Sequence, residues 1–242
     1  MNLIIDIGNT ATKLAVFQSD KIKEVQTVSA QNLVLEVEKL LKKFSGIKQG
    51  LLSSVKITDY LEIESLQKLL PIKILEATFK LPFKNGYDTP LTLGVDRLAL
   101  MAAAFNQHPN SNVLVIDAGS CITYDFMDSD QNYLGGAISP GVEMRYKSLE
   151  AFTSNLPLLQ KTIPNKCVGS STEGSMHSGV VYGVSHEIEG TIKKYQNKYS
   201  DLTVILTGGD ADFLCKQFKI SIFAHSNFLL EGLNFLLEFN SN

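Results

Sequence analysis

The feature that most limits how this chain can fold is a short pattern that occurs twice. A shift of 111 residues, from position 6 to position 117, brings two strand-like segments into register, each with an apolar lead-in and an Asp-x-Gly turn. The shift places Asp6, Gly8 and Thr12 on Asp117, Gly119 and Thr123. Two copies of strand, turn and strand indicate two halves built from one supersecondary unit. Two such turns could hold one ligand between them.

The first copy, IIDIGNTATK, predicts a β-hairpin with apolar strands at 3–5 and 14–17. We expect Gly8 and Asn9 to take the positive φ angles of a tight hairpin turn, beside hydroxyls and backbone N–H groups that suit a phosphate. Asp6, at the strand end, could hold a magnesium ion that contacts this phosphate, directly or through water. A plain hairpin with an Asx turn fits this stretch equally well.

Length and charge narrow the class of protein. The 242 residues are enough for two domains of ordinary size. The net charge of −3 provides no basic field for nucleic acid or anionic lipid, so we expect neither nucleic acid nor membrane as a partner. The longest apolar run, 98–105, is too short to cross a bilayer, and Asp6 comes too early for a signal peptide. We therefore expect a cytoplasmic protein.

The cysteines and histidines do not form a metal-binding pattern. Cys121, Cys167 and Cys215 have neither the spacing of a zinc site nor an even number for disulfides, and we expect them to be reduced and buried. The four histidines contain no i, i+4 pair, so we assign none of them to a metal.

Strands and helices alternate along the chain, which predicts an α/β fold. In the first half we expect strands at 22–28, 50–55 and 71–77, helices at 31–44 and 64–70, an irregular loop at 81–94 and a helix at 96–105. In the second half we expect a hairpin at 112–127, a strand, Gly-Pro loop and helix across 133–152, and helices around 175–196 and 227–239.

Between those last two helices, VILTGGDADFL predicts a strand that runs through Gly208 and Gly209 into a further helix. Two glycines there would let the backbone approach a flat or phosphorylated ligand closely. The same arrangement also occurs in folds without any ligand at that point.

Five motifs follow one another in a fixed order: DIGNT, GVDR, DAGS, GGAISPG and TGGD. In these motifs the chain resembles the type III pantothenate kinases, members of the actin, sugar-kinase and heat-shock-chaperone ATPase superfamily, over nearly its whole length. The resemblance implies an α/β fold of two ribonuclease-H-like domains, 1–112 and 113–242, with mixed central sheets flanked by helices and an ATP cleft between them. It also implies ATP-dependent phosphorylation of the primary hydroxyl of pantothenate to 4'-phosphopantothenate, the first step of coenzyme A biosynthesis.

The resemblance implies a nucleotide and cation site. Asp117 would bind a monovalent cation, K⁺ or NH₄⁺, and Asp6 would bind Mg²⁺. Ser120 stands where the family usually has threonine, and it keeps the hydroxyl. The residues implied in binding ATP are Asp6, Ile7, Gly8, Asn9, Thr10, Ala11, Thr12, Lys13 and Ser120.

In GVDR the resemblance implies that Asp96 is the catalytic base and that Arg97 binds the substrate. A carboxylate beside a primary alcohol can accept its proton during phosphoryl transfer, and a guanidinium can bind the pantothenate carboxylate through two hydrogen bonds. Both can reach the substrate only from the first turn of a helix. Without the other motifs, a helix-capping Asp-Arg pair would be the simpler interpretation. The residues implied in substrate binding are Tyr87, Gly94, Val95, Asp96, Arg97 and Thr172.

Three further expectations concern the second half and the assembly. SSTEGS, which contains Thr172, also predicts a helix N-terminus capped by serine or threonine. Gly135, Gly136 and Gly141 should shape a loop under the nucleotide. The family forms homodimers, and we expect the run 98–105 and the helix-rich second half to supply apolar surface for one.

Two other functions stay open at this point. One is a kinase of the same superfamily that acts on another hydroxylated acid or sugar, although many of those chains are longer. The other is a non-enzymatic ATP-binding switch, which would need no alcohol-activating carboxylate beside an anion-binding arginine. Some relatives are also described as accessory factors for transcription, so a second role is compatible with the sequence.

Overall fold

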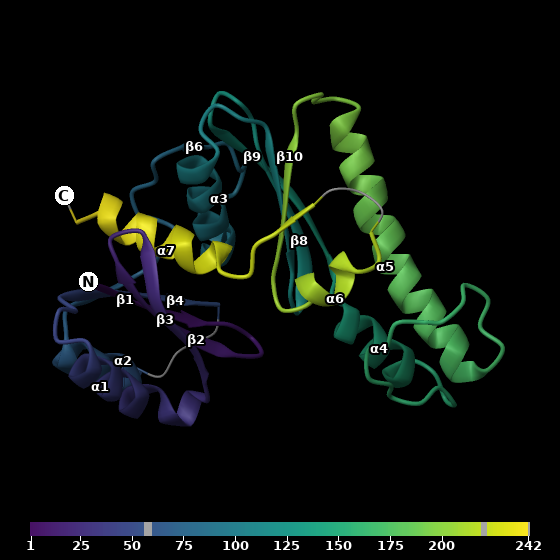
Figure 1. The fold of residues 1–242 in the computed structure, drawn as a ribbon, viewed down its shortest axis with the longest axis horizontal. Helices are drawn as coiled ribbons and strands as arrows, with labels where there is room; N and C mark the ends of the chain where they lie inside the picture. The colour runs from purple at the N-terminus through teal and green to yellow at the C-terminus, as the bar shows by residue number, and fades with distance from the viewer. Residues whose placement is uncertain (56–59, 219–221, 242) are drawn as a thin grey trace. The chain divides into compact units, whose positions relative to one another are not determined.

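The computed structural model describes residues 1–55, 60–218 and 222–241, and the chain divides into two compact units (Figure 1). The first unit contains residues 1–109, 131–134 and 227–242, and the second contains 110–130 and 135–226. The end of the chain is thus grouped with its beginning. The domain boundary between residues 112 and 113 stays a prediction.

The first unit is built on a five-stranded mixed sheet with the order β3-β2-β1-β4-β5. The strands β1, β2 and β3 are antiparallel neighbours, and β1, β4 and β5 are parallel ones. This arrangement confirms the predicted hairpin and the strands that follow it. The strand bounds are β1 Asn2–Ile7, β2 Thr12–Gln18, β3 Lys21–Val28, β4 Gln49–Ser54 and β5 Ile72–Ile74.

Alternate residues of β1 point to opposite faces of this sheet. Leu3, Ile5 and Ile7 pack into one core with α1 (Leu33–Lys43) and α2 (Tyr60–Leu69). Asp6 therefore points to the other face, the one that contacts α3 (Val95–Gln107) and α7 (Phe228–Phe239). Asp6 therefore lies outside the hydrophobic core that this strand forms with α1 and α2.

The two helices of that second layer, α3 and α7, pack very closely. A side chain at Gly232 of α7 would overlap the backbone of Ala99 in α3, so glycine is required there. The side chains from Leu98 to Ala104 are almost completely buried. The expectation that the run 98–105 offers free apolar surface for a dimer is therefore wrong, because the core of the first unit uses it.

The second unit is also built on a mixed sheet, with helices α4, α5 and α6 packed on one face of it. Figure 1 shows the long helix α5 beside the strands of this unit. The strand order is β11-β10-β7-β8-β9-β6, in which the short β6 (Lys84–Asn85) and residues 131–134 belong to the first unit. The bounds are β7 Val113–Ala118, β8 Cys121–Met127, β9 Asn132–Pro140, α4 Val142–Ala151, α5 Thr172–Gln196, β10 Thr203–Thr207, α6 Ala211–Cys215 and β11 Phe223–Ala224.

The two hairpins have the same plan but not the same length. In the first, Asp6 pairs with Lys13, and in the second, Asp117 pairs with Thr123. The second turn is therefore one residue shorter, and the predicted match of Thr12 with Thr123 is off by one. In pairing position, Thr123 corresponds to Lys13.

Two sequence-based expectations about local structure need correction. Neither Gly8 nor Asn9 has a positive φ angle; among the described glycines, Gly135 and Gly208 do. Because four residues join β1 to β2, the turn does not need the backbone of a two-residue hairpin. The cysteines are reduced but not buried: Cys121 and Cys215 are half-buried and Cys167 is exposed. Among the described helices, none is long and apolar enough to span a membrane.

Candidate active site

Asp6 is a buried carboxylate at the end of the central strand of the first unit, with 8% of its surface exposed. Burial raises its pKa from the usual 3.8 to about 6; the opposing Lys13 lowers it and the charge of Asp96 raises it. Asp6, Lys13 and Asp96 thus interact electrostatically within one unit. The structure thus brings Asp96, from a distant part of the sequence, close to the Asp6–Lys13 pair of the first hairpin.

The turn after Asp6 is held by its own backbone. Gly8 N–H donates to the Ala11 carbonyl at 3.0 Å, and a Cβ at Gly8 would lie only 3.1 Å from that oxygen. Asn9 and Thr10 are exposed, while Thr12 is buried. The turn therefore presents polar groups to the surrounding solvent directly beside the Asp6 carboxylate.

These residues fit a magnesium site of the kind that ATP-dependent enzymes use. Mg²⁺ usually binds one or two carboxylates, water and substrate phosphates, rather than a complete set of protein ligands. The charge of Asp96 raises the pKa of Asp6, and a cation bound at Asp6 would offset this repulsion. Within residues 1–55, 60–218 and 222–241, no group of three or more His, Cys, Asp or Glu side chains could hold a metal ion.

Asp96 and Arg97 lie in the first turn of α3, as predicted, because the helix begins at Val95. Arg97 N–H donates to the Asp96 carboxylate at 2.8 Å. A Cβ at Gly94 would lie 2.5 Å from the same carboxylate, so the missing side chain of Gly94 leaves the space that Asp96 occupies. Gly94 and Val95 thus position the acid by backbone geometry.

The guanidinium of Arg97 lies over the ring of Tyr87, with its central carbon 5.3 Å from the ring centroid. Arg97 is only 5% exposed, and its Nη1 lies 3.5 Å from the Tyr87 hydroxyl. The Tyr87 ring in turn stacks on Tyr133, with centroids 6.1 Å apart and planes 5° apart. The loop 81–94 therefore delivers Tyr87 to the start of α3, as the substrate-site prediction requires.

Tyr133 is a contributor to this arrangement that the sequence analysis did not identify. It is completely buried, it packs edge-on against Phe83, and its carbonyl accepts a hydrogen bond from Gly86 N–H at 2.9 Å. Its position depends on the pairing of β6 with β9. Because this pairing joins distant segments of the chain, no local sequence pattern predicts the role of Tyr133.

Asp117, Ser120 and the TGGD motif meet in the second unit. Asp117 is half-buried, Ser120 is exposed, and β10 pairs with β7 so that Thr207 faces Asp117. Gly208 has a φ of 96°, and a side chain there would overlap the Asp117 carboxylate. The Asp210 N–H donates to the Ala118 carbonyl at 2.9 Å. The two motifs therefore form one backbone-lined surface at the ends of neighbouring strands.

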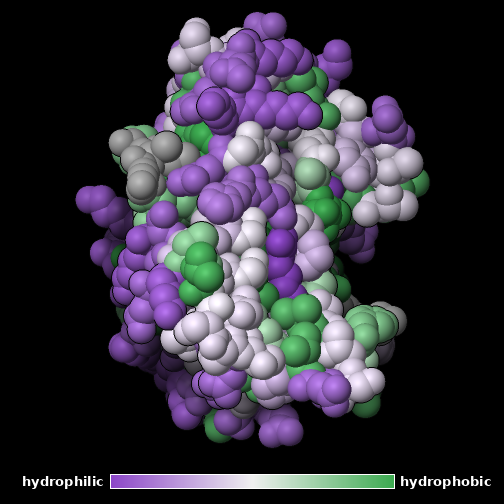
Figure 2. Space-filling view, turned by 90° about the vertical axis from the view of Figure 1, so that its right-hand side faces the viewer, coloured by the Kyte–Doolittle hydropathy of each residue, from purple (hydrophilic) through white to green (hydrophobic). Residues whose placement is uncertain are grey.

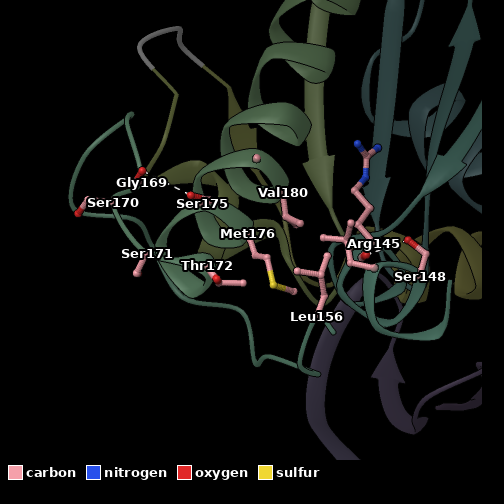
Figure 3. A pocket seen from close by; sticks show the side chains of 12 residues that line it. Arg145, Ser148, Leu156, Gly169, Ser170, Ser171, Thr172, Ser175, Met176 and Val180 are labelled. Atoms are coloured by element: carbon pink, nitrogen blue, oxygen red, sulfur yellow. Dashed lines mark hydrogen bonds between the residues drawn. The ribbon is translucent and has the colours of Figure 1, made fainter. Parts of the chain in front are cut away.

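Thr172 lies elsewhere in the second unit, at the first residue of α5. Ser171 caps this helix by accepting a hydrogen bond from Gly174 N–H at 3.1 Å, which confirms the predicted helix start. Thr172 lines a cavity of about 830 Å³ together with residues of α4 and α5 (Figure 3). Its lining mixes apolar side chains such as Leu156, Met176 and Val180 with the hydroxyl groups of several serines.

Solved structures of other proteins have a similar fold. The solved structure of a Campylobacter jejuni protein named for the Baf family of transcriptional activators is 22% identical, with a TM-score of 0.65 and 99% of each chain covered. A Listeria monocytogenes structure named for N-acetylmannosamine kinase is 12% identical, with a TM-score of 0.54. The comparison covers 100% of this chain and 99% of that chain. These likenesses agree with the predicted α/β fold of mixed sheets flanked by helices.

The sequence comparisons are more specific. Residues 2–194 match the family model described as type III pantothenate kinase. A type III pantothenate kinase from Christiangramia forsetii is 53% identical over 240 residues, which cover 99% of each chain. The chain belongs to the type III pantothenate kinase family, which catalyses the ATP-dependent phosphorylation of pantothenate in coenzyme A biosynthesis. The predicted family and reaction are confirmed.

Proposed function

We propose that this chain transfers the γ-phosphoryl group of ATP to the primary hydroxyl of pantothenate, with Asp96 as the general base. The observation that carries the proposal is the grouping of Asp6, Asp96, Arg97 and Tyr87 in the first unit. Phosphoryl transfer needs mainly positioning, charge stabilisation and a group that accepts the alcohol proton. Asp96, fixed by Gly94 and by the Arg97 N–H, is suited to the last of these roles.

The ATP phosphates are proposed to contact the turn of the first hairpin, from Asp6 to Lys13. Asp6 would hold Mg²⁺ there, directly or through water, and the bound ion would offset the negative charge of the phosphates. Lys13, opposite Asp6 in the hairpin, brings a positive charge to the same place. In the second unit, Ser120 is proposed to contact the nucleotide, and Asp117 to bind K⁺ or NH₄⁺ beside it.

Pantothenate has a carboxylate at the end opposite its reacting hydroxyl. We assign recognition of this carboxylate to Arg97, because a buried guanidinium competes with little water and can donate two parallel hydrogen bonds. Tyr87 holds the guanidinium plane by stacking on it. Gly94 and Val95 are the backbone neighbours of this site, and Thr172 is proposed as a further substrate contact.

A homodimer is supported by apolar side chains that the second unit exposes. Phe152, Val168 and Leu158 are 88%, 78% and 58% exposed, respectively. In Figure 2, which views the right-hand side of Figure 1, hydrophobic side chains form groups among hydrophilic ones. Grouped exposed apolar side chains are typical of association surfaces. We propose that a second copy of the chain covers them.

Sedimentation analysis at micromolar concentration tests this assembly, with Phe152→Glu expected to dissociate the dimer. Tyr60→Glu, at a side chain of the first unit that is 72% exposed, is the matched control. A wild-type protein that sediments as a monomer would contradict the dimer.

A cytoplasmic location follows from the proposed use of ATP and from the place of the reaction in coenzyme A biosynthesis.

The decisive test of the function is incubation of the purified chain with ATP, Mg²⁺ and pantothenate, with and without K⁺, followed by detection of 4'-phosphopantothenate. Glucose and N-acetylmannosamine serve as competing acceptors. We expect phosphorylation of pantothenate alone. Phosphorylation of a sugar instead would favour another kinase of the superfamily, and ATP binding without any transfer would favour a switch protein.

A further inference from the structure

A polar network links the two large helices of the second unit to strand β9. Arg145 of α4 donates through Nη2 to Glu187 of α5 at 2.5 Å and to the Ser139 hydroxyl at 2.8 Å. Its Nε donates to the Pro140 carbonyl at 2.9 Å. Tyr124 of β8 donates its hydroxyl to the second oxygen of Glu187 at 2.8 Å. One guanidinium therefore fixes two consecutive residues at the end of β9.

The carboxylate partner is charged at neutral pH. Burial alone would raise the pKa of Glu187, but hydrogen bonds from Ser139, Arg145 and Tyr124 outweigh burial and lower it. The side chains of Arg145 and Glu187 are 23% and 31% exposed, respectively, so water only partly screens the pair.

The segment that Arg145 fixes lies directly against the second Asp-x-Gly turn. Gly141 N–H donates to the Ser120 carbonyl at 3.2 Å. A side chain at Gly141 would overlap the carbonyl oxygens of both Gly119 and Ser120. A shift of Pro140 and Gly141 would therefore move the turn that carries Ser120.

Arg145 also lines the cavity that contains Thr172, which suggests a direct role in substrate binding as the alternative. Figure 3 shows, however, that its guanidinium extends away from Met176 and Leu156, toward the strands. The hydrogen bonds to Ser139 and Pro140 agree with this direction. The stem of Arg145 lines the cavity, and its charged group acts on β9.

We propose that Arg145 is a positioning residue for ATP: through Ser139, Pro140 and Gly141 it holds the turn of Gly119 and Ser120 in the conformation that meets the nucleotide. This inference rests on the proposed function, in that ATP contacts Ser120. It assigns a role in the nucleotide site to a side chain that does not itself contact the ligand.

The test measures ATP affinity and steady-state kinetics separately. Isothermal titration of ATP with Mg²⁺ gives the affinity, and turnover gives kcat and the KM for pantothenate. We expect Arg145→Ala to weaken ATP binding about tenfold, which corresponds to the loss of one charge-assisted hydrogen bond. The KM for pantothenate should stay the same. Arg145→Lys keeps the charge but not the planar fork, and should recover part of the affinity.

Lys147→Ala is the matched control. Lys147 lies on the same helix and forms an exposed ion pair with Glu143 at 3.7 Å, and none of its described contacts reaches β9. Its ATP affinity should equal that of the wild type. If Arg145→Ala does not fold, Ser139→Ala decides, since it removes the bridging hydroxyl without leaving a charge unpaired.

Wild-type ATP affinity in folded Arg145→Ala would overturn the proposal, as would a raised KM for pantothenate with unchanged ATP affinity. A different result would contradict the proposed function: the wild-type chain would bind ATP but would not phosphorylate pantothenate. In that case the titrations with ATP still decide the role of Arg145. A wild-type chain without any ATP affinity would overturn both.

Discussion

Asp6 and Lys13 occupy directly opposed positions in the first hairpin, and Lys13 lowers the pKa of a carboxylate that burial raises to about 6. The folded chain thus keeps a carboxylate in a place where its charge is unfavourable, opposite the cationic Lys13. Such an arrangement is costly for folding alone and useful for binding a cation. The first two predictions separate these two consequences.

Asp6→Ala is expected to abolish Mg²⁺-dependent ATP turnover while the protein stays folded. The side chain lies at a strand end, outside the core that β1 forms with α1 and α2. Circular dichroism and a turnover assay on the same sample check this. Normal turnover by a folded variant would remove Asp6 from the phosphate and metal site.

The second prediction concerns stability without Mg²⁺ and ATP. Because the pKa of Asp6 is higher in the folded chain than its usual 3.8, folding is favoured by the protonated form. This contribution is fully present below pH 3.8 and is lost as the pH rises through 6, which amounts to about 3 kcal/mol. Asp6→Asn should therefore be more stable than the wild type at pH 7.5, and this advantage should vanish near pH 4.

Urea unfolding at both pH values measures the difference, with Asp20→Asn at an exposed turn as the control. Equal stabilities of wild type and Asp6→Asn at pH 7.5 would mean that burying the Asp6 charge does not destabilise the folded chain.

Asp96→Asn should bind ATP and pantothenate but turn over on the order of a hundredfold to ten-thousandfold more slowly. Asparagine keeps an oxygen that can accept the hydrogen bond from Arg97 N–H, so the start of α3 should be preserved. Binding titrations and kcat check this separation. Near-native turnover would move the base elsewhere, and loss of ATP binding would assign Asp96 to the nucleotide site or the fold.

Arg97→Ala should raise the KM for pantothenate roughly ten- to a hundredfold, with a smaller change in kcat. The guanidinium is proposed to bind a carboxylate that is present throughout the reaction, so its loss weakens substrate and transition state alike. Steady-state kinetics at varied pantothenate check this. The control is pantetheine, which has the same reacting hydroxyl but no carboxylate: the penalty should be absent with it, and an equal penalty would contradict carboxylate recognition.

Activity is expected to rise with K⁺ or NH₄⁺, and the rise should depend on Asp117. Asp117→Asn removes the charge from a half-buried position beside Gly208 and should abolish the activation. Turnover in K⁺, NH₄⁺ and Na⁺ buffers of equal ionic strength checks this. Full activity in Na⁺ alone would remove the cation role from Asp117.

The elements that the sequence predicted well are those with local signals. The hairpin of β1 and β2, the amphipathic α1 and the start of α3 all follow from periodicity and from nearby glycine or polar residues. The motifs were also enough to predict the family, because five of them in order are specific.

The interactions that the sequence did not predict depend on contacts between distant segments. The run 98–105 has the composition of an association surface, and only the packing of α7 on α3 reveals that it is core. Tyr133 and Arg145 likewise gain their roles from strand pairing and helix packing. An ungapped alignment of the two repeats cannot show that the second turn is one residue shorter, because the length of each turn becomes known only from the strand pairing.

The packing of α7 on α3 has a consequence for protein synthesis. Ribosomes deliver α3 well before α7, and at ordinary elongation rates the delay is roughly ten seconds. During that time the surface from Leu98 to Ala104 lacks α7, the helix whose Gly232 later packs against Ala99. The unit that begins the chain is therefore the last to be completed, and the nascent protein should depend on chaperones that shield α3 until its C-terminal partner emerges.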